Sequence, residues 1–202
     1  MRFGQKLAGF ALTGFAVVSL WVAPAAAGWK IMPSGEEVKV AKSKMTVTPA
    51  QDWNRWSERP SKRGEIWTLD GISLNELTFM AQIGNGEPLY RERDKKNNPL
   101  PKFKSDMLPT DLVELFEASS RIVLQTSLFE ITNVEPTKIS GKDAVRFSYR
   151  FVTRGDELAR QGEAVAANVD GKFYLANFVA PSIHYYERDL PKFRALTNSL
   201  KI

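Results

Sequence analysis

Few side chains in this sequence are of the types that usually carry chemistry. His184 is the only histidine, and the 202 residues include no cysteine. Metal sites built on histidine pairs and thiol–histidine catalytic dyads are therefore excluded. The sequence also lacks a Gly-x-Ser-x-Gly nucleophile elbow, a calcium-binding loop and a glycine-rich phosphate loop. We expect no metal and no cofactor, and these absences favour a protein that is not an enzyme.

A pair of carboxylates can still be brought together by folding, as in glycoside hydrolases. Glu163 and Asp156 are the candidates for an acid-dependent hydrolase of this kind. Asp156 also ends an Arg-Gly-Asp tripeptide, but it falls between two expected strands, where glycine and aspartate are ordinary turn residues. The hydrolase stays open as an alternative to a binding protein.

Tryptophan and basic residues indicate a candidate binding surface. Trp53 and Trp67 are expected in the core, whereas Trp56 lies beside the charged run 57–63 and is expected to be partly exposed. Exposed tryptophan next to arginine is typical of interfaces. The candidate binding residues are Trp56, Arg59, Arg91, Arg93, Lys95, Lys96, Lys102 and Lys104.

Most of these cations belong to the segment 87–106, which has no apolar period and includes three prolines. We expect a long, exposed, basic loop there. It would attract an acidic envelope protein, a membrane-associated assembly or an anionic lipid surface, and salt would weaken the attraction. Nucleic acid is not favoured as a partner, because a formal net charge of +5 is small for such a binder. A small-ligand or lipid carrier, with an apolar pocket between sheet and helix, is the other alternative.

The N-terminal segment has the build of a secretory signal peptide. Arg2 and Lys6 precede the apolar run 7–22, and the small residues Ala25 and Ala27 suit cleavage after Ala27. The alternative is an uncleaved anchor, but the run is shorter than the roughly 20 residues that usually span a bilayer. We expect residues 1–27 to be removed and the protein to be periplasmic or secreted. Residues 28–43 then form an extended lead into a single domain, 44–202.

Hydrophobic patterns predict strands, a helix, more strands and a closing helix. Val145, Phe147, Tyr149 and Phe151 alternate with polar residues, as in a strand with one buried face. Asp170-Gly171 is a hairpin signal, so antiparallel pairing is expected. The expected strands are 44–48, 65–69, 77–83, 129–134, 144–152, 163–169 and 172–180. One helix opens at Pro109-Thr110-Asp111, where Thr110 or Asp111 can accept a hydrogen bond from its first turn, and another is confined by Pro191 to the C-terminal side of that proline. The sequence thus predicts an α+β fold, with helices packed on a mainly antiparallel sheet.

Several of these segments together resemble the PsbP-like superfamily, which includes extrinsic photosystem subunits and bacterial envelope proteins of the DcrB type. The resemblance implies an α/β/α sandwich that typically serves as a binding or assembly module, and the basic segment 87–106 departs from the pattern. The matching segments are Met45-Thr46-Val47-Thr48-Pro49 followed by Trp53, the helix from Asp111, Ser140 to Phe147, Asp170-Gly171 with Phe173-Tyr174-Leu175, and the ending Phe193 to Ile202.

Overall fold

A single antiparallel sheet of eight strands organises the chain. The computed structural model describes residues 28–126, 128–153, 155 and 158–202, so the expected signal peptide and Asp156 lie outside the described residues. The strand order is β1-β4-β5-β6-β10-β9-β8-β7, and a separate pair is formed by β2 and β3. The strands are β1 Trp29–Met32, β2 Val38–Lys39, β3 Thr46–Val47, β4 Trp53–Trp56, β5 Gly64–Thr68, β6 Glu76–Ile83, β7 Phe129–Ile139, β8 Lys142–Val152, β9 Ala159–Val169 and β10 Lys172–Pro181.

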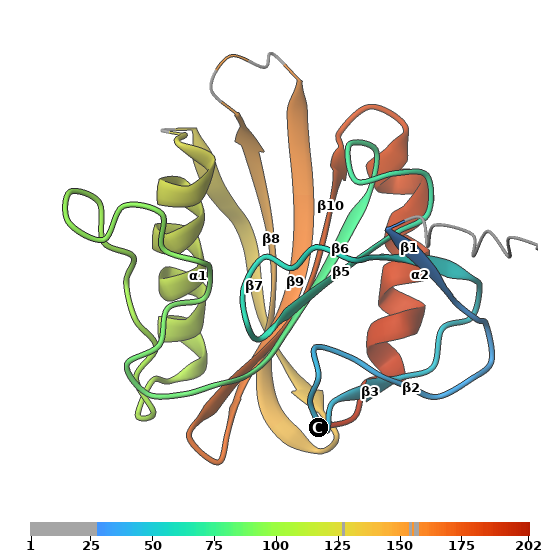
Figure 1. The fold of residues 1–202 in the computed structure, drawn as a ribbon, viewed down its shortest axis with the longest axis horizontal. Helices are drawn as coiled ribbons and strands as arrows, with labels where there is room; N and C mark the ends of the chain where they lie inside the picture. Colours follow the sequence, from blue (N-terminus) through green and yellow to red (C-terminus); the bar gives the residue numbers. More distant parts are fainter. Residues whose placement is uncertain (1–27, 127, 154, 156–157) are drawn as a thin grey trace, which may run out of the picture.

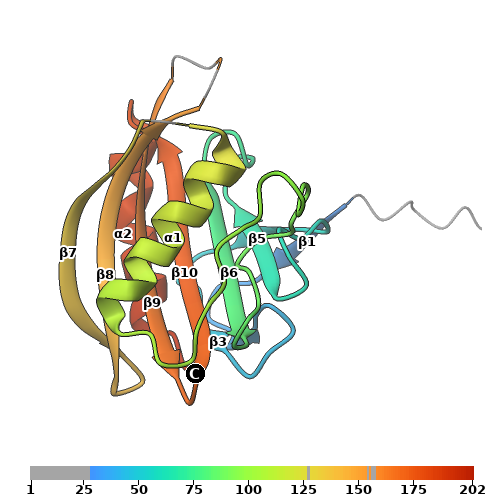
Figure 2. The ribbon, with the colours of Figure 1, turned by 90° about the vertical axis from the view of Figure 1, so that its left-hand side faces the viewer.

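One helix covers each face of this sheet (Figures 1 and 2). Helix α1, Pro109–Leu124, packs on β7, β8 and β9, and helix α2, Tyr185–Asn198, packs on β9 and β10 from the opposite side. The expected α+β class and the α/β/α layering are confirmed. No helix in the described part of the chain is long and apolar enough to cross a membrane.

Helix α1 begins at the predicted Pro109-Thr110-Asp111 opening, whereas α2 begins earlier than its pattern predicted. Pro109 is the first residue of α1, and the Asp111 carboxylate accepts a hydrogen bond from the Leu108 backbone N–H at 2.7 Å. Pro191 lies inside α2, so the expectation that it confines the helix to its C-terminal side is wrong. A proline removes one backbone donor, and here the carbonyl group that loses its partner belongs to the exposed Glu187.

The loop between β6 and α1 is not the fully exposed segment that its composition suggested. Leu89, Leu100 and Phe103 are buried. Leu89 and Phe103 pack with α1 and the sheet in one of two apolar cores. The loop thereby runs beside α1 over strands that the helix leaves uncovered (Figure 2). Its basic side chains still face solvent, because the three buried residues are separated by polar stretches.

The N-terminal segment 28–43 is likewise part of the domain and not only a lead into it. Strand β1 pairs with β4, in the register Trp29 to Trp56, and forms one edge of the sheet. Val40 and Ala41 are buried in the second core, which also contains Trp53 and Trp67 between the sheet and α2. The core position expected for these two tryptophans is confirmed.

Candidate functional site

A cavity of about 650 Å³ lies on the α1 face of the sheet. Its walls come from α1, from the inward faces of β6, β8 and β10, and from the loop segments 58–60 and 90–93. Helix α1 covers only the β7 to β9 side of this face. The loop before α1 runs over the other side (Figure 2), and the cavity lies between the loop, the helix and the sheet. A volume of this size is typical of sites for small ligands.

Aromatic and aliphatic side chains form most of the cavity wall. Phe129 stacks on Tyr149, with ring centroids 4.9 Å apart, and on Phe151, at 5.8 Å. Phe116 from α1 meets Tyr149 at 5.2 Å, and Val179 from β10 completes this side. These residues lie together because alternate side chains of β8 and β10 point to the α1 face of the sheet. The wall is therefore suited to the apolar body of a ligand.

Polar side chains from neighbouring strands interrupt this wall at the floor of the cavity. The Tyr149 hydroxyl donates a hydrogen bond to Asn177 Oδ1 at 2.7 Å, and both residues are buried. Burial raises the pKa of Tyr149 well above its usual value, with nearby Tyr90 adding to the effect, so this hydroxyl stays protonated. The pair provides a fixed polar group beside the aromatic wall.

Glu76 and Tyr90 also line the floor. The Thr78 hydroxyl donates to Glu76 Oε1 at 2.7 Å, and burial raises the pKa of Glu76, while the Thr78 hydrogen bond and the charge of Arg160 partly offset that rise. The Tyr90 hydroxyl lies 3.3 Å from the Ser120 hydroxyl of α1, and burial raises the pKa of Tyr90 to about 12. Titratable groups perturbed by burial in a concave site are typical of functional sites.

Arginines surround this floor. Arg91 and Arg93 are exposed, and neither guanidinium pairs with an acid in the described part of the chain. Arg59 lies 3.8 Å from Glu65, which partly neutralises it, and Arg160 donates to the Ser73 carbonyl oxygen at 3.0 Å. The arginine rim, defined here as Arg59, Arg91, Arg93 and Arg160, can attract an anion to the mouth of a cavity whose inner end combines aromatic and polar side chains.

The structure divides the eight predicted binding residues into two sets. Trp56, Arg59, Arg91 and Arg93 line the cavity. Lys95 and Lys96 are exposed farther along the loop, and Lys102 and Lys104 border a separate, shallow hollow at the far end of it. The structure thus brings only the first set to one site, and the binding role of all eight stays a prediction.

The polar floor was missed from the sequence. Glu76, Tyr90, Tyr149 and Asn177 are far apart in the chain and match no motif, so only the topology shows that they meet. Asn177 alone carried a signal, because it interrupts the apolar strand run from Phe173 to Ala180. A polar residue in a central strand is expected to have a buried partner or a function.

The candidates for catalysis lie elsewhere. Glu163 is 1% exposed on the α2 face, where Arg146 and Arg194 each approach one of its oxygens at 2.6 Å. Burial opposes ionisation of Glu163, but hydrogen bonds from Arg194 and Arg146 outweigh it and lower its pKa. His184 is exposed at the start of α2, against the ring of Tyr185. Neither Glu163 nor His184 lines the cavity. Among the described residues, no group of three histidine or acidic side chains is placed to hold a metal.

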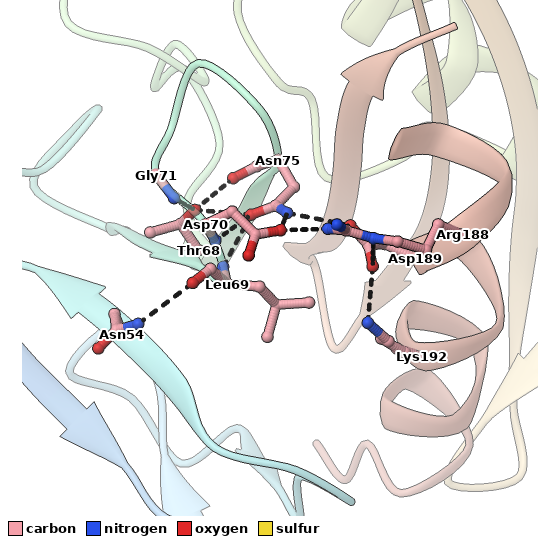
Figure 3. Close-up of polar contacts among 9 residues, drawn as sticks. All are labelled: Asn54, Thr68, Leu69, Asp70, Gly71, Asn75, Arg188, Asp189 and Lys192. Atoms are coloured by element: carbon pink, nitrogen blue, oxygen red, sulfur yellow. Dashed lines mark hydrogen bonds and ion pairs between the residues drawn. The ribbon is translucent and has the colours of Figure 1, made fainter. Parts of the chain in front are cut away.

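A second polar cluster joins α2 to the connection between β5 and β6 (Figure 3). The buried Asp189 carboxylate accepts hydrogen bonds from Arg188 at 2.6 Å, Lys192 at 2.7 Å and Asn75 at 3.0 Å. Asn75 also donates to Asp70 at 2.8 Å, and Asp70 pairs with Arg188. Because this carboxylate is filled by its own partners, we assign the cluster a role in holding α2 on the sheet.

Comparison with known proteins gives likenesses of fold. No protein-family model matches the chain, and no curated protein sequence matches it. Similar solved structures include cyanobacterial PsbP (CyanoP) from Synechocystis sp. PCC 6803, at 16% identity over 87% of this chain and 82% of that one, with a TM-score of 0.46. A structure from Bacteroides thetaiotaomicron has 11% identity over 83% and 48% of the two chains, with a TM-score of 0.48.

A further similar structure is Mycobacterium tuberculosis LpqN, described as involved in cell envelope biogenesis. It has 8% identity over 87% of this chain and 91% of that one, with a TM-score of 0.36. Identities this low concern the fold alone, and a shared fold does not fix a function. At that level, the chain has a weak resemblance to PsbP-like domains.

Proposed function

We propose that this protein is a non-enzymatic binding module of the bacterial cell envelope that holds an anionic amphiphile in the cavity under α1. The observation that carries the proposal is the combination of an aromatic wall and an arginine rim in one cavity of about 650 Å³. The expected signal peptide supports an extracytoplasmic address. This function corresponds to the small-ligand or lipid carrier that the sequence left open as an alternative, and it assigns that carrier a specific site.

The wall supports an apolar ligand body. Phe116, Phe129 and Phe151 contribute ring surface to a cavity that water would otherwise fill. Removing apolar area from water stabilises a complex by roughly 25 cal/mol per Å² before the costs of association. An alkyl or acyl chain presents such area without unpaired polar atoms, which makes it a suitable occupant.

The rim supports a negative charge on the same ligand. The guanidinium groups of Arg91 and Arg93, which pair with no acid among the described residues, can bind a carboxylate or phosphate through two parallel N–H donors. Lys95 and Lys96 extend the positive field along the loop without lining the cavity. We therefore assign to these lysines a role in steering, which salt would screen.

Titration calorimetry with laurate tests the proposal. We expect one site per chain, and an affinity about five- to tenfold weaker in an Arg91→Gln/Arg93→Gln variant, since two exposed charge contacts contribute roughly 1 to 1.4 kcal/mol. Lys102→Gln/Lys104→Gln is the matched control, because it removes the same charge from the separate hollow. Equal weakening by both variants would show a general charge effect and would contradict a site at the arginine rim.

Binding of an acidic envelope partner by the basic loop stays a second prediction. Its supporting observation is that Lys95 and Lys96 are exposed and do not line the cavity. A pull-down from envelope extract, with wild type and a Lys95→Gln/Lys96→Gln variant, tests it. One partner lost at moderate salt and in the variant is the expected result. A partner retained equally by the variant would exclude these lysines.

A further inference from the structure

The inner end of the cavity contains a hydrogen-bond donor that no described residue uses. Asn177 is 5% exposed and lines the cavity. Its Oδ1 accepts the Tyr149 hydroxyl at 2.7 Å, but no residue in the described part of the chain accepts a hydrogen bond from its Nδ2. Nearly all polar groups inside folded proteins have a hydrogen-bond partner, so a donor that lines a cavity without one is a candidate contact for a ligand.

An unused acceptor lies beside this donor. Glu76 Oε1 accepts the Thr78 hydroxyl at 2.7 Å, whereas Oε2 receives no hydrogen bond from the described residues. Thr78 pairs directly with Asn177, and Glu76 is the next inward residue along β6. Glu76 and Asn177 are therefore diagonal neighbours on one face of the sheet, a relation that places Cα atoms roughly 7–8 Å apart. One small ligand group can contact both side chains.

We infer that the floor of this cavity recognises a neutral polar group on the ligand, a hydroxyl or an amide, through Asn177 and Glu76. Asn177 Nδ2 donates to the oxygen of this group, and the Glu76 carboxyl accepts its O–H or N–H hydrogen. This inference rests on the proposed function and refines it. The ligand is then an anionic amphiphile whose apolar body carries a hydroxyl or amide, in contrast to a plain fatty acid.

The neighbouring polar groups are consistent with a neutral group at this position. Tyr149 and Tyr90 stay protonated because burial raises the pKa of each. Arg160, whose charge favours ionisation of Glu76, donates to the Ser73 carbonyl oxygen. A second anion at the floor would lie beside the Glu76 carboxylate, and the anionic end of the ligand already has the arginine rim. A plain alkyl segment would leave the Asn177 amide unpaired.

Calorimetric titration with laurate and with hydroxylaurates tests the inference. The series includes hydroxylaurates with the hydroxyl near the carboxylate, at mid-chain and at the methyl end, so that the titrations also show which position reaches the floor. We expect at least one hydroxylaurate to bind about tenfold more tightly than laurate, the equivalent of one buried hydrogen bond. Hydroxylaurates that all bind no better than laurate would overturn the inference while leaving the proposed function intact. If neither laurate nor any hydroxylaurate binds, both fail.

Two variants locate the effect. Tyr149→Phe/Asn177→Leu removes both members of the buried pair, so neither is left without a partner, and we expect it to lose the preference for the hydroxylated ligand. Tyr149→Phe alone is the matched control, because it keeps the Asn177 amide and should keep the preference. Circular dichroism on heating checks that both variants fold. A preference that survives in the double variant would exclude Asn177 as the recognising group.

Discussion

The ring of Tyr149 lies directly over the backbone of Gly162 on the neighbouring strand. The two residues are cross-strand partners, and a Cβ atom built on residue 162 would lie 2.2 Å from Tyr149 Cζ. Because Gly162 has no side chain, the ring can lie across β9 and its hydroxyl can reach Asn177 on β10. Glycine inside a strand often marks such a close approach. The shape of the cavity floor therefore depends on the absence of a single methyl group.

The first prediction follows from this contact. Gly162→Ala should displace the Tyr149 ring and lower the free energy of unfolding by about 1–3 kcal/mol, the usual cost of overpacking. Urea denaturation measures the loss. Gly84→Ala is the control, since its new Cβ would meet only the flexible ends of Lys172 at 3.2 Å and Glu87 at 3.3 Å. Similar losses in both variants would contradict the role given to Gly162.

Glu76 is expected to reduce stability at neutral pH. Burial raises its pKa in the folded protein, with the Thr78 hydrogen bond and Arg160 only partly opposing this. The unfolded chain therefore ionises first, and stability falls as the pH rises from the unfolded pKa towards the folded one. Glu76→Gln should be more stable than wild type by on the order of 1 kcal/mol at neutral pH. The difference should vanish below the ordinary glutamate pKa of about 4.3.

Denaturant titrations of both proteins across this pH range measure the difference. A gain for Glu76→Gln that persists at low pH would exclude ionisation as its cause. If the variant is stabilised but loses affinity for the hydroxylated ligand, Glu76 is retained for binding at the expense of stability, a common trade-off at functional sites.

Asp189 should have the opposite pH dependence. Burial disfavours its charge, but hydrogen bonds from Arg188, Lys192 and Asn75 outweigh burial and lower its pKa. Such a carboxylate stabilises the fold above the unfolded pKa, and this contribution is lost as the pH falls through the folded pKa. Asp189→Asn should lower the free energy of unfolding by about 2–3 kcal/mol at neutral pH. This loss is smaller than for a fully buried ion pair, because Arg188 and Lys192 are partly exposed.

The loss should shrink as the pH falls below the ordinary aspartate pKa of about 3.9, and thermal unfolding followed across pH checks it. Asp143→Asn is the matched control, because Asp143 forms only an exposed pair with Lys138 at 3.2 Å and should change stability by less than about 0.5 kcal/mol. A control loss as large as that of Asp189→Asn would contradict the structural role of the cluster in Figure 3.

Much of the fold was predictable because its strands carry regular local patterns. The alternation from Val145 to Phe151 and the hairpin at Asp170-Gly171 correspond to β8, β9 and β10 as observed. The buried loop residues were not predictable, because Leu89, Leu100 and Phe103 are spaced without a period and become apolar contacts only through tertiary packing.

The candidate site was predictable only in part. Trp56, Arg59, Arg91 and Arg93 were selected for their exposure and charge, properties that composition shows, and they line the cavity. Asn177 and Glu76 were not selected, because their significance comes from strand register, which pairs β6 with β10 across a long stretch of sequence. Register depends on non-local contacts that no single-segment pattern records.

Binding of laurate to a protein with a blocked cavity tests the central claim most directly. Val123 lines the cavity on α1 and is 44% exposed, whereas Val134 on β7 is 47% exposed and does not line it. Calorimetric titration of wild type, Val123→Trp and Val134→Trp compares insertion of the same bulk at the two places. We predict one laurate per chain for wild type and Val134→Trp, and an affinity at least tenfold weaker for Val123→Trp, because the indole fills the space that the alkyl chain needs. Undiminished binding by Val123→Trp, or no binding by wild type, would contradict the account.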